Sequence, residues 1–163
     1  MLEFFIFALV TSITPGPNNS MLMASGMRFG RKESLPHFLG IWLGFTFLFF
    51  IGGYLLSFVP EQVFEYLQYF GYVVITYIAY KIGTTKSGSE KKTGLEKPLT
   101  FIQACLFQWV NPKGVIMAIS GLTAFNITKV EGSLIYFSIL PFSLGVWLLT
   151  GEGLQMWLSK SSV

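Results

Sequence analysis

The stretch FFIFALVTSITPGPNNSMLMASGM, residues 4–27, contains no charged side chain and is interrupted in its middle by the run TPGPN at residues 14–18. A helix needs about 20 apolar residues to cross a hydrocarbon core roughly 30 Å thick, so this stretch is long enough to span a membrane. Its prolines and glycine predict that the spanning helix is broken near its midpoint. A secretory signal peptide is a poorer interpretation, because Glu3 and no basic residue precedes the apolar run.

Charged residues are scarce in the whole chain of 163 residues, of which 52% are hydrophobic and 12% are charged. A soluble domain carries about 25% charged residues. The charges that remain lie mainly in short segments between apolar stretches. We therefore predict an all-α integral membrane protein with a single transmembrane domain, 1–163, and about five transmembrane helices at residues 4–27, 35–59, 66–83, 100–125 and 133–151.

A second break, NPKG at residues 111–114, interrupts the fourth apolar stretch at a matching position. Pro15 lies 11 residues after Phe4, and Pro112 lies 11 residues after Phe101. At a rise of about 1.5 Å per residue, each break comes roughly 16 Å into its span, near the membrane midplane. Thr-Pro and Asn-Pro are favourable helix starts, so we predict half-helices that begin at Pro15 and Pro112 and are capped by the preceding Thr and Asn side chains.

The two breaks divide the chain into a first repeat at residues 1–83, a linker at residues 84–98 and an incomplete second repeat at residues 99–163. Half-helices that start at the midplane and run in opposite directions are typical of transporters built from inverted repeats. The predicted architecture is therefore a 3+2 remnant of a 3+3 inverted repeat, with its first and fourth spans broken. Two independent proline kinks, which membrane helices tolerate, are the alternative.

The basic residues predict the orientation of the chain in the membrane. If the spans alternate in direction, nine Lys and Arg residues fall on one side of the membrane and Lys129 falls on the other. Basic residues are enriched in cytoplasmic loops, so the N-terminus is predicted outside and the linker at residues 84–98 in the cytoplasm. Because these cations lie at membrane edges, the net charge of +3 does not indicate a nucleic-acid partner. The nine residues are Arg28, Arg31, Lys32, Lys81, Lys86, Lys91, Lys92, Lys97 and Lys160.

The starts of the two predicted half-helices indicate a binding site for a carboxylate. A helix N-terminus carries about half a positive charge and unpaired amides. Lys113 adds a full charge there, unless it extends to the interface or caps neighbouring carbonyls. Gln108 and Asn111 share a helical face if the helix persists, and they either bind a polar ligand or join helices. The candidate substrate-binding residues are Thr14, Pro15, Gly16, Pro17, Asn18, Gln108, Asn111, Pro112, Lys113 and Gly114.

Other residues that could carry chemistry have structural interpretations. Gly40 and Gly44 form a small-xxx-small pair, which favours close helix packing. His37 is interpreted as an interfacial residue and not as a proton relay, and the lone Cys105 as a buried structural thiol. The sequence has one His, one Cys and eight acids, which lie mainly in loops. These residues offer no nucleophile with a base, carboxylate pair or metal cluster, so we expect neither enzymatic activity nor a cofactor.

The motifs at both breaks resemble those of the LysE/RhtB family of amino-acid exporters. The similarity comprises TPGPN at residues 14–18, GRK at residues 30–32, Gly40 with Gly44, and QWVNPKG at residues 108–114, in the same order. The last motif is most similar to the branch that exports cysteine and O-acetylserine. The resemblance implies efflux of an amino-acid-like small molecule through the lipid bilayer of a bacterial inner (cytoplasmic) membrane, driven by the proton gradient.

Members of that family are longer and have six spans, whereas this sequence reaches Val163 shortly after its fifth predicted span. Without a sixth helix, one side of the second break would face lipid, which offers no partner for freed carbonyls. We therefore expect another copy of the chain to cover this side in a homodimer, or the chain to be unstable alone. The alternative to export is a truncated family remnant, or a small membrane partner protein, that does not transport.

Overall fold

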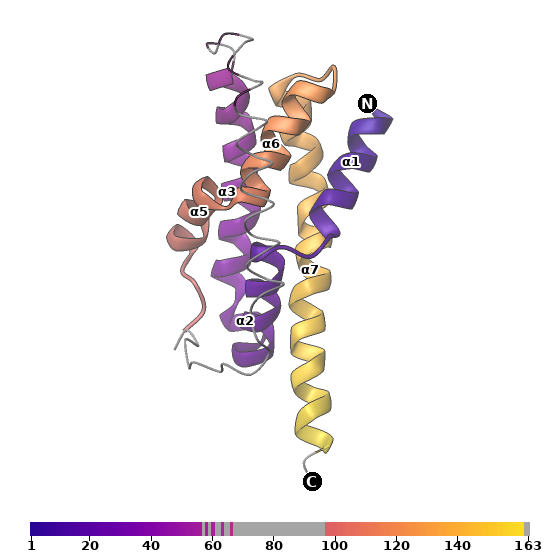
Figure 1. The fold of residues 1–163 in the computed structure, drawn as a ribbon. Helices are drawn as coiled ribbons and strands as arrows, with labels where there is room; N and C mark the ends of the chain where they lie inside the picture. The colour runs from indigo at the N-terminus through magenta and orange to yellow at the C-terminus, as the bar shows by residue number, and fades with distance from the viewer. Residues whose placement is uncertain (57, 59, 61–62, 64–65, 67–96, 162–163) are drawn as a thin grey trace.

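The computed structural model describes residues 1–56, 58, 60, 63, 66 and 97–161, which form helices and connecting segments with no strand among them. This finding confirms the all-α class. The predicted third span at residues 66–83 and the linker at residues 84–98 lie almost entirely outside the described residues. The helices (Figure 1) are α1 (Leu2–Ile13), α2 (Pro17–Glu33), α3 (Leu35–Leu56), α5 (Phe101–Val110), α6 (Pro112–Ala124) and α7 (Lys129–Ser161).

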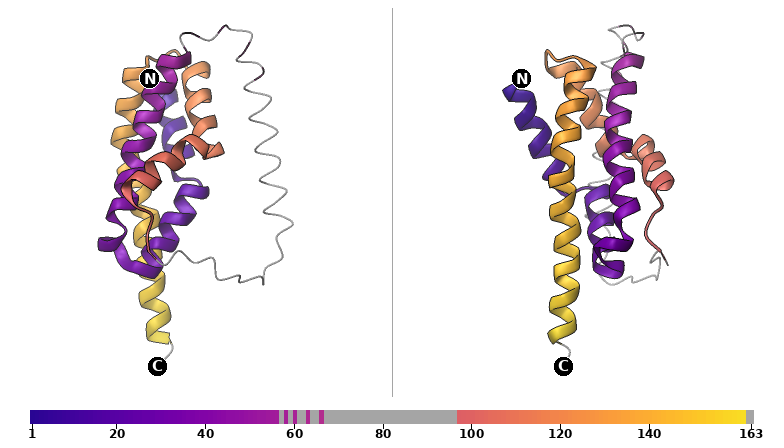
Figure 2. Two further views of the ribbon diagram at one scale, coloured as in Figure 1. Left: turned by 90° about the vertical axis from the view of Figure 1, so that its left-hand side faces the viewer. Right: turned by 180° about the vertical axis from the view of Figure 1, so that it is seen from behind.

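Helices α3 and α7 run side by side along the molecule (Figures 1 and 2). Their segments Leu35–Leu55 and Lys129–Lys160 are long and apolar enough to cross a membrane, and among the described helices only these two meet that test. Helices α1 and α5 are apolar but short. The 12 residues of α1 rise about 18 Å, less than the thickness of a hydrocarbon core. Two complete spans therefore frame the fold, and the predicted first and fourth spans each consist of two shorter helices.

The first break is an extended segment from Thr14 to Gly16 that separates α1 from α2. The second helix begins at Pro17, with the extended Gly16 as its N-cap residue, so the predicted start at Pro15 was wrong. The reason is the second proline. A residue that precedes proline is disfavoured in the α region, so Gly16 does not continue a helix from Pro15. Pro17 takes the first helical position, where its missing N–H costs no hydrogen bond.

The second break is the single residue Asn111 (φ −78°, ψ 107°), which lies between α5 and α6. Helix α6 begins at Pro112, as predicted. Helices α2 and α6 both begin near mid-height and run in opposite directions (Figure 1). This is the arrangement of half-helices that the two proline motifs predicted. The symmetry of the two repeats stays a prediction, because residues 67–96 lie outside the described part of the chain.

Glycines bring the shorter helices close to the complete spans. A Cβ atom added at Gly40 would lie 2.5 Å from the carbonyl oxygen of Phe101, and one at Gly44 would lie 2.8 Å from a Cα atom of α5. The predicted packing role of this glycine pair is therefore confirmed. Gly26 of α2 and Gly151 of α7 make a similar contact, in which an added Cβ would overlap a backbone oxygen of the other helix. Backbone-to-backbone packing thus holds α5 against α3, and α2 against α7.

Aromatic rings fill much of the described core. The Phe4 ring centroid lies 5.9 Å from that of Phe49, 5.5 Å from that of Phe125 and 5.6 Å from that of Tyr136. Such ring pairs contribute stability beyond the area that they bury. This cluster joins α1, α3, α7 and the segment after α6, so the end of the molecule that holds the N-terminus (Figure 1) is packed around α1.

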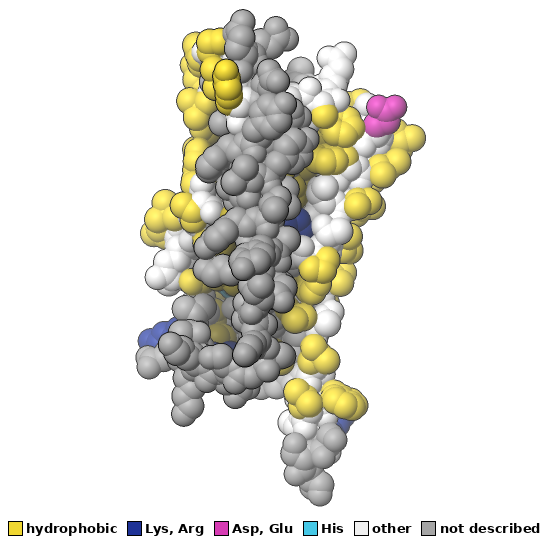
Figure 3. All heavy atoms as spheres, viewed as in Figure 1, with side chains coloured by type: hydrophobic (Ala, Val, Ile, Leu, Met, Phe, Trp, Pro, Cys, Tyr) yellow, Lys and Arg dark blue, Asp and Glu magenta, His cyan; other side chains and the backbone are white. Residues whose placement is uncertain are grey.

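The described surface is largely apolar, as expected for a protein in lipid. In Figure 3 hydrophobic side chains spread over much of the face that grey atoms leave visible, and an acidic side chain lies near the upper end. Phe142 of α7 and Val110 of α5 are 77% and 72% exposed. Large apolar side chains exposed to this degree over a wide surface mark a membrane or protein contact.

Two interpretations of single residues need correction. His37 is 1% exposed, and its Nδ1 atom lies 2.9 Å from the hydroxyl of Ser25, so it is not interfacial. Its burial follows from the connection between α2 and α3, which is the single residue Ser34 and turns the start of α3 back against α2. Cys105 is half-buried, and its thiol contacts the carbonyl oxygen of Gly40 at 3.3 Å.

Candidate functional site at the helix breaks

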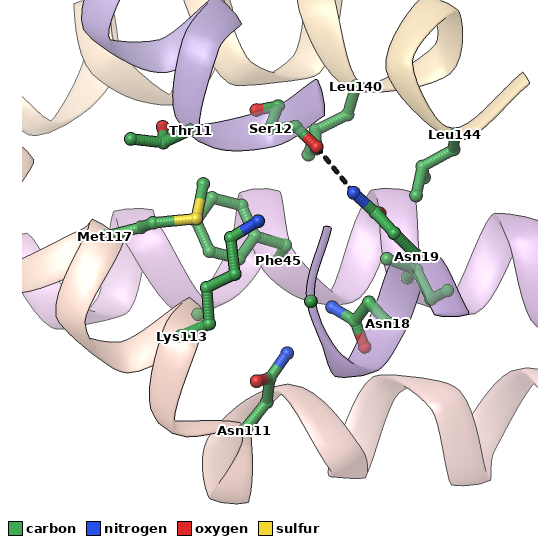
Figure 4. A pocket seen from close by; sticks show the side chains of 13 residues that line it. Thr11, Ser12, Asn18, Asn19, Phe45, Asn111, Lys113, Met117, Leu140 and Leu144 are labelled. Carbon is green, nitrogen blue, oxygen red and sulfur yellow. Dashed lines mark hydrogen bonds between the residues drawn. The ribbon is translucent and has the colours of Figure 1, made fainter. Parts of the chain in front are cut away.

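A small, partly open cavity lies between the two breaks (Figure 4). Helices α1, α2, α3, α6 and α7 contribute side chains to its wall, and Gly16 and Asn111 contribute from the breaks themselves. Lys113 is the one charged residue among the described residues that line it. The other lining residues are Thr11, Ser12, Asn18, Asn19, Ile41, Phe45, Gly114, Met117, Leu140 and Leu144. The wall is thus polar at the breaks and apolar toward the complete spans.

The carboxyl-terminal end of α1 has carbonyl groups that helix geometry leaves without an intrahelical partner. The Nδ2 atom of Asn19 donates to the carbonyl oxygens of Ser12 and Thr14, at 2.8 Å each. The indole Nε1 of Trp147 donates to the carbonyl oxygen of Ile13 at 3.0 Å. In lipid an unsatisfied polar group costs several kcal/mol. Side chains from α2 and α7 therefore make this break possible at membrane depth.

Lys113, in the first turn of α6, extends across to the same carbonyls. Its Nζ atom donates to the Thr14 carbonyl oxygen at 2.6 Å, to the Thr14 hydroxyl at 2.9 Å and to the Pro15 carbonyl oxygen at 3.3 Å. Gly16 makes room for it, because an added Cβ atom there would lie 2.5 Å from Cδ of Lys113. Of the alternatives for Lys113, the structure shows the one in which it caps neighbouring carbonyls.

A reciprocal pair of amides joins the two broken helices. Nδ2 of Asn18 donates to Oε1 of Gln108 at 2.7 Å. Nε2 of Gln108 donates to Oδ1 of Asn18 at 3.3 Å and to the carbonyl oxygen of Ala104 at 2.8 Å. Gln108 is fully buried and lies outside the cavity wall. In this structure Gln108 therefore joins helices, whereas Asn18 both joins helices and lines the cavity.

The predicted side-chain caps are not formed at either break. The hydroxyl of Thr14 donates back to the carbonyl oxygen of Thr11 at 2.9 Å, and the N-cap residue of α2 is Gly16. Asn111 is the N-cap residue of α6, but its side chain makes no capping bond. The starts of α2 and α6 therefore face the cavity region with uncapped amides.

Two buried acceptors in the cavity wall have no partner among the described residues. They are Oδ1 of Asn111, a residue that is 1% exposed, and Oγ of Ser12, a residue that is 4% exposed. Buried polar atoms in proteins are nearly always hydrogen-bonded. These two atoms therefore lack the partner that a buried polar atom normally has, although both belong to residues of the cavity wall.

The structure brings half of the predicted site residues into the cavity wall, namely Gly16, Asn18, Asn111, Lys113 and Gly114. Thr14 and Pro15 contribute oxygen acceptors to Lys113, and Pro17 and Pro112 begin the half-helices. Sequence reasoning missed Thr11, Ser12 and Asn19. The sequence nevertheless contained a signal for these three residues. Polar residues within a turn of a break in a membrane helix are expected to form hydrogen bonds with the freed backbone groups.

Metal ligands are not grouped in the described part of the chain, where no three His, Cys, Asp or Glu residues come together in a way that could hold an ion.

Helices interrupted at membrane depth, with a polar cavity between the breaks, are typical of membrane transporters. Together with two complete apolar helices, this construction defines a helical membrane transport protein. The family model described as LysE type translocator matches residues 9–160. The chain belongs to the LysE-type translocator family, and it is therefore a transport protein and not an enzyme.

The chain is similar to cysteine/O-acetylserine efflux proteins of Escherichia coli (strain K12), Escherichia coli O1:K1 / APEC and Shigella flexneri serotype 5b (strain 8401). Each is 26% identical, over an alignment that covers 93% of this chain and 82% of the relative. No solved structure matches the chain.

Proposed function

We propose that this protein exports amino acids or close derivatives across a bacterial inner membrane. The observation that carries the proposal is the cavity between the two helix breaks, in which Lys113 is the charged residue of the described wall. Membership of a translocator family supports transport, and the efflux proteins to which the chain is similar support the substrate class. Cysteine and O-acetylserine both carry an ammonium and a carboxylate group on one carbon atom, so this zwitterion is the part of the substrate to be recognised.

The substrate carboxylate binds at the starts of α2 and α6. The backbone amides of Asn18 and Asn19 in α2, and of Lys113 and Gly114 in α6, lie in first turns, where helix geometry supplies no acceptor. Neither start has a side-chain cap. Each helix start contributes about half a positive charge, which attracts an anion most strongly where little water screens it.

In the proposed mechanism, α2 and α6 run in opposite directions because they belong to the two inverted halves of the protein. In inverted-repeat transporters, two halves of the protein rock around a site at the midplane and expose it to either side in turn. In the proposed orientation the N-terminus lies outside and the linker at residues 84–98 lies in the cytoplasm, and the proton gradient drives efflux, as in the family that the sequence resembles.

The proposal is tested by uptake of labelled amino acids into inside-out membrane vesicles, in which export is measured as accumulation. We expect vesicles that contain the protein to accumulate cysteine or O-acetylserine above the level of vesicles that lack it, and an uncoupler to abolish the difference. If the folded protein moves no amino acid of a broad panel, the proposal is wrong and a membrane partner protein without transport becomes the better interpretation.

A further inference from the structure

The contact between Lys113 and the first break uses the whole hydrogen-bonding capacity of the lysine. An ammonium group has three N–H donors, and three acceptors surround Nζ at 2.6, 2.9 and 3.3 Å, two from Thr14 and one from Pro15. A carboxylate in the cavity can therefore not gain a direct bond from Lys113 unless the lysine releases an acceptor. The lysine and the carbonyls form a closed ion–dipole contact at the wall of the cavity.

We propose that Lys113 stands in for the ammonium group of the substrate, and that a zwitterionic amino acid binds by exchange with it. The carboxylate of the amino acid accepts hydrogen bonds from the ammonium group of Lys113. The ammonium group of the amino acid donates to the Thr14 and Pro15 carbonyls that Lys113 has released. This inference rests on the proposed export of amino acids and adds the residues that select the zwitterion. It makes Lys113, Thr14 and Pro15 the elements of selectivity.

The exchange conserves the pairing of buried groups only for a zwitterion. A carboxylate without an ammonium group would draw Lys113 away, so that the Pro15 carbonyl loses its Lys113 donor and the Thr14 carbonyl keeps only the Asn19 amide, which is costly at membrane depth. An amine without a carboxylate would displace Lys113 and leave its charge without an anionic partner, which is also costly. A zwitterion avoids both costs, because it supplies one new partner for each group that the exchange exposes.

The cavity wall contains an acceptor for Lys113 after the lysine has released Thr14. Lys113 and Asn111 both line the cavity, and Oδ1 of Asn111 is a buried acceptor without a partner in the described part of the protein. This oxygen lies at the start of the helix that carries Lys113, so it can accept from the lysine once Thr14 is released. In Figure 4 the Lys113 side chain extends from the start of α6 toward α1, and the Asn111 side chain lies beside the base of Lys113.

The contact at Gly16 sets the resting position of the lysine. An added Cβ atom at Gly16 would lie 2.5 Å from Cδ and 3.1 Å from Nζ of Lys113. A Gly16→Ala variant therefore keeps the lysine and its charge but moves it off the Thr14 carbonyl. A Lys113→Met variant keeps an unbranched side chain and removes the charge. The first variant displaces the lysine from the carbonyls, and the second removes its positive charge.

The test measures binding of three related ligands to the purified protein in detergent by calorimetry or thermal shift. Cysteine has both charged groups, cysteamine lacks the carboxylate, and 3-mercaptopropionate lacks the ammonium group. For the unaltered protein we expect cysteine to bind roughly tenfold more tightly, or better, than either analogue, because each lost charge-assisted hydrogen bond changes affinity by about this factor.

In Lys113→Met the Pro15 carbonyl loses its lysine donor and the Thr14 carbonyl keeps only the Asn19 amide. We therefore expect cysteamine to bind more tightly than before and the preference for cysteine over cysteamine to fall toward one. In Gly16→Ala the lysine is free to bind an anion, so we expect 3-mercaptopropionate to bind more tightly than it does to the unaltered protein. Lys160→Met and Gly145→Ala are the matched controls, because Lys160 lies near the end of α7 and an added Cβ at Gly145 meets no atom within 4 Å.

Unchanged preferences in a folded Lys113→Met or Gly16→Ala variant would overturn the exchange, and either variant suffices if the other does not fold. If the unaltered protein exports cysteine in vesicles but both variants keep its ligand preferences, the exchange is wrong and the proposed function stands. If the unaltered protein neither binds nor exports any amino acid, both the exchange and the proposed function are wrong.

Discussion

At the scale of residues, the first break shows how a helix can be interrupted inside a membrane without exposing polar backbone to lipid. Water would pair the freed carbonyls in a soluble protein, but lipid offers no donor. Here Asn19, Trp147 and Lys113 donate to successive carbonyls between Ser12 and Pro15. The donors come from three helices, so the break is stable only in the assembled protein.

Two buried amides beside the breaks should respond differently to truncation. Gln108 is paired with Asn18 and Ala104, so Gln108→Ala leaves buried groups unpaired and should cost about 1–3 kcal/mol of stability. Asn111 has an unpaired oxygen in the cavity wall, so Asn111→Ala should leave the unfolding temperature nearly unchanged and lower the rate of export. Thermal unfolding in detergent and vesicle uptake separate the two effects. Equal loss of stability in both variants would contradict the assignment of Asn111 to the substrate.

At the scale of elements, glycines decide how closely the short helices approach the complete spans. Lipid tails are as apolar as the helix surfaces, so helix association in membranes depends on close packing more than on removal of apolar area from solvent. Gly40 and Gly44 of α3 face α5, Gly26 of α2 faces the backbone of α7 at Leu148, and Gly151 of α7 faces the backbone of α2 at Met23. The half-helices that carry the cavity are thus positioned by contacts in which a single methyl group would intrude.

Gly40→Leu should lower the yield of folded protein, because a side chain there would meet the Phe101 carbonyl and force α5 away from α3. Overpacking of this kind typically costs about 1–3 kcal/mol. The measurement is the fraction of protein that elutes as a single species in size-exclusion chromatography after detergent extraction. Gly153→Leu is the control, because an added Cβ atom there meets nothing within 4 Å. Equal yields for the two variants would show that the α3–α5 contact is not required.

At the scale of the whole molecule, the apolar surface and the distribution of cations determine how the protein lies in the membrane. Arg31 and Glu152 form an ion pair, with Nε and Oε2 3.6 Å apart, toward the end of the molecule where α2 finishes and α7 continues. This is the end that the sequence assigns to the cytoplasm. Lys129 begins α7 at the opposite end.

A reporter fused within residues 87–92 should be cytoplasmic, and one at residues 61–63 should be external. The expectation follows from the nine basic residues that fall on one side of the membrane against Lys129 on the other. Paired reporters that are active on only one side of the membrane, such as alkaline phosphatase and green fluorescent protein, make the measurement. An external signal from residues 87–92 would reverse the proposed orientation of the chain in the membrane.

Several features could be predicted from the sequence because they depend on local chemistry. The lack of charge over long stretches identified membrane helices, and proline identified both breaks and the start of α6 at Pro112. Pro17 could also have been recognised as the start of α2, since a residue before proline avoids the helical region. These properties belong to short segments, and neighbours in the chain are sufficient to determine them.

The partners at the breaks were decided by the tertiary structure alone. Lys113 lies 99 positions from Thr14, and Trp147 lies 134 positions from Ile13, yet each contact determines whether a break is stable. The burial of His37 and the entry of Ser12 and Asn19 into the site also follow from how helices pack. The sequence by itself determined where the helices had to be interrupted. Which side chains satisfy the carbonyls freed there depends on contacts between distant helices, so only the folded protein could show it.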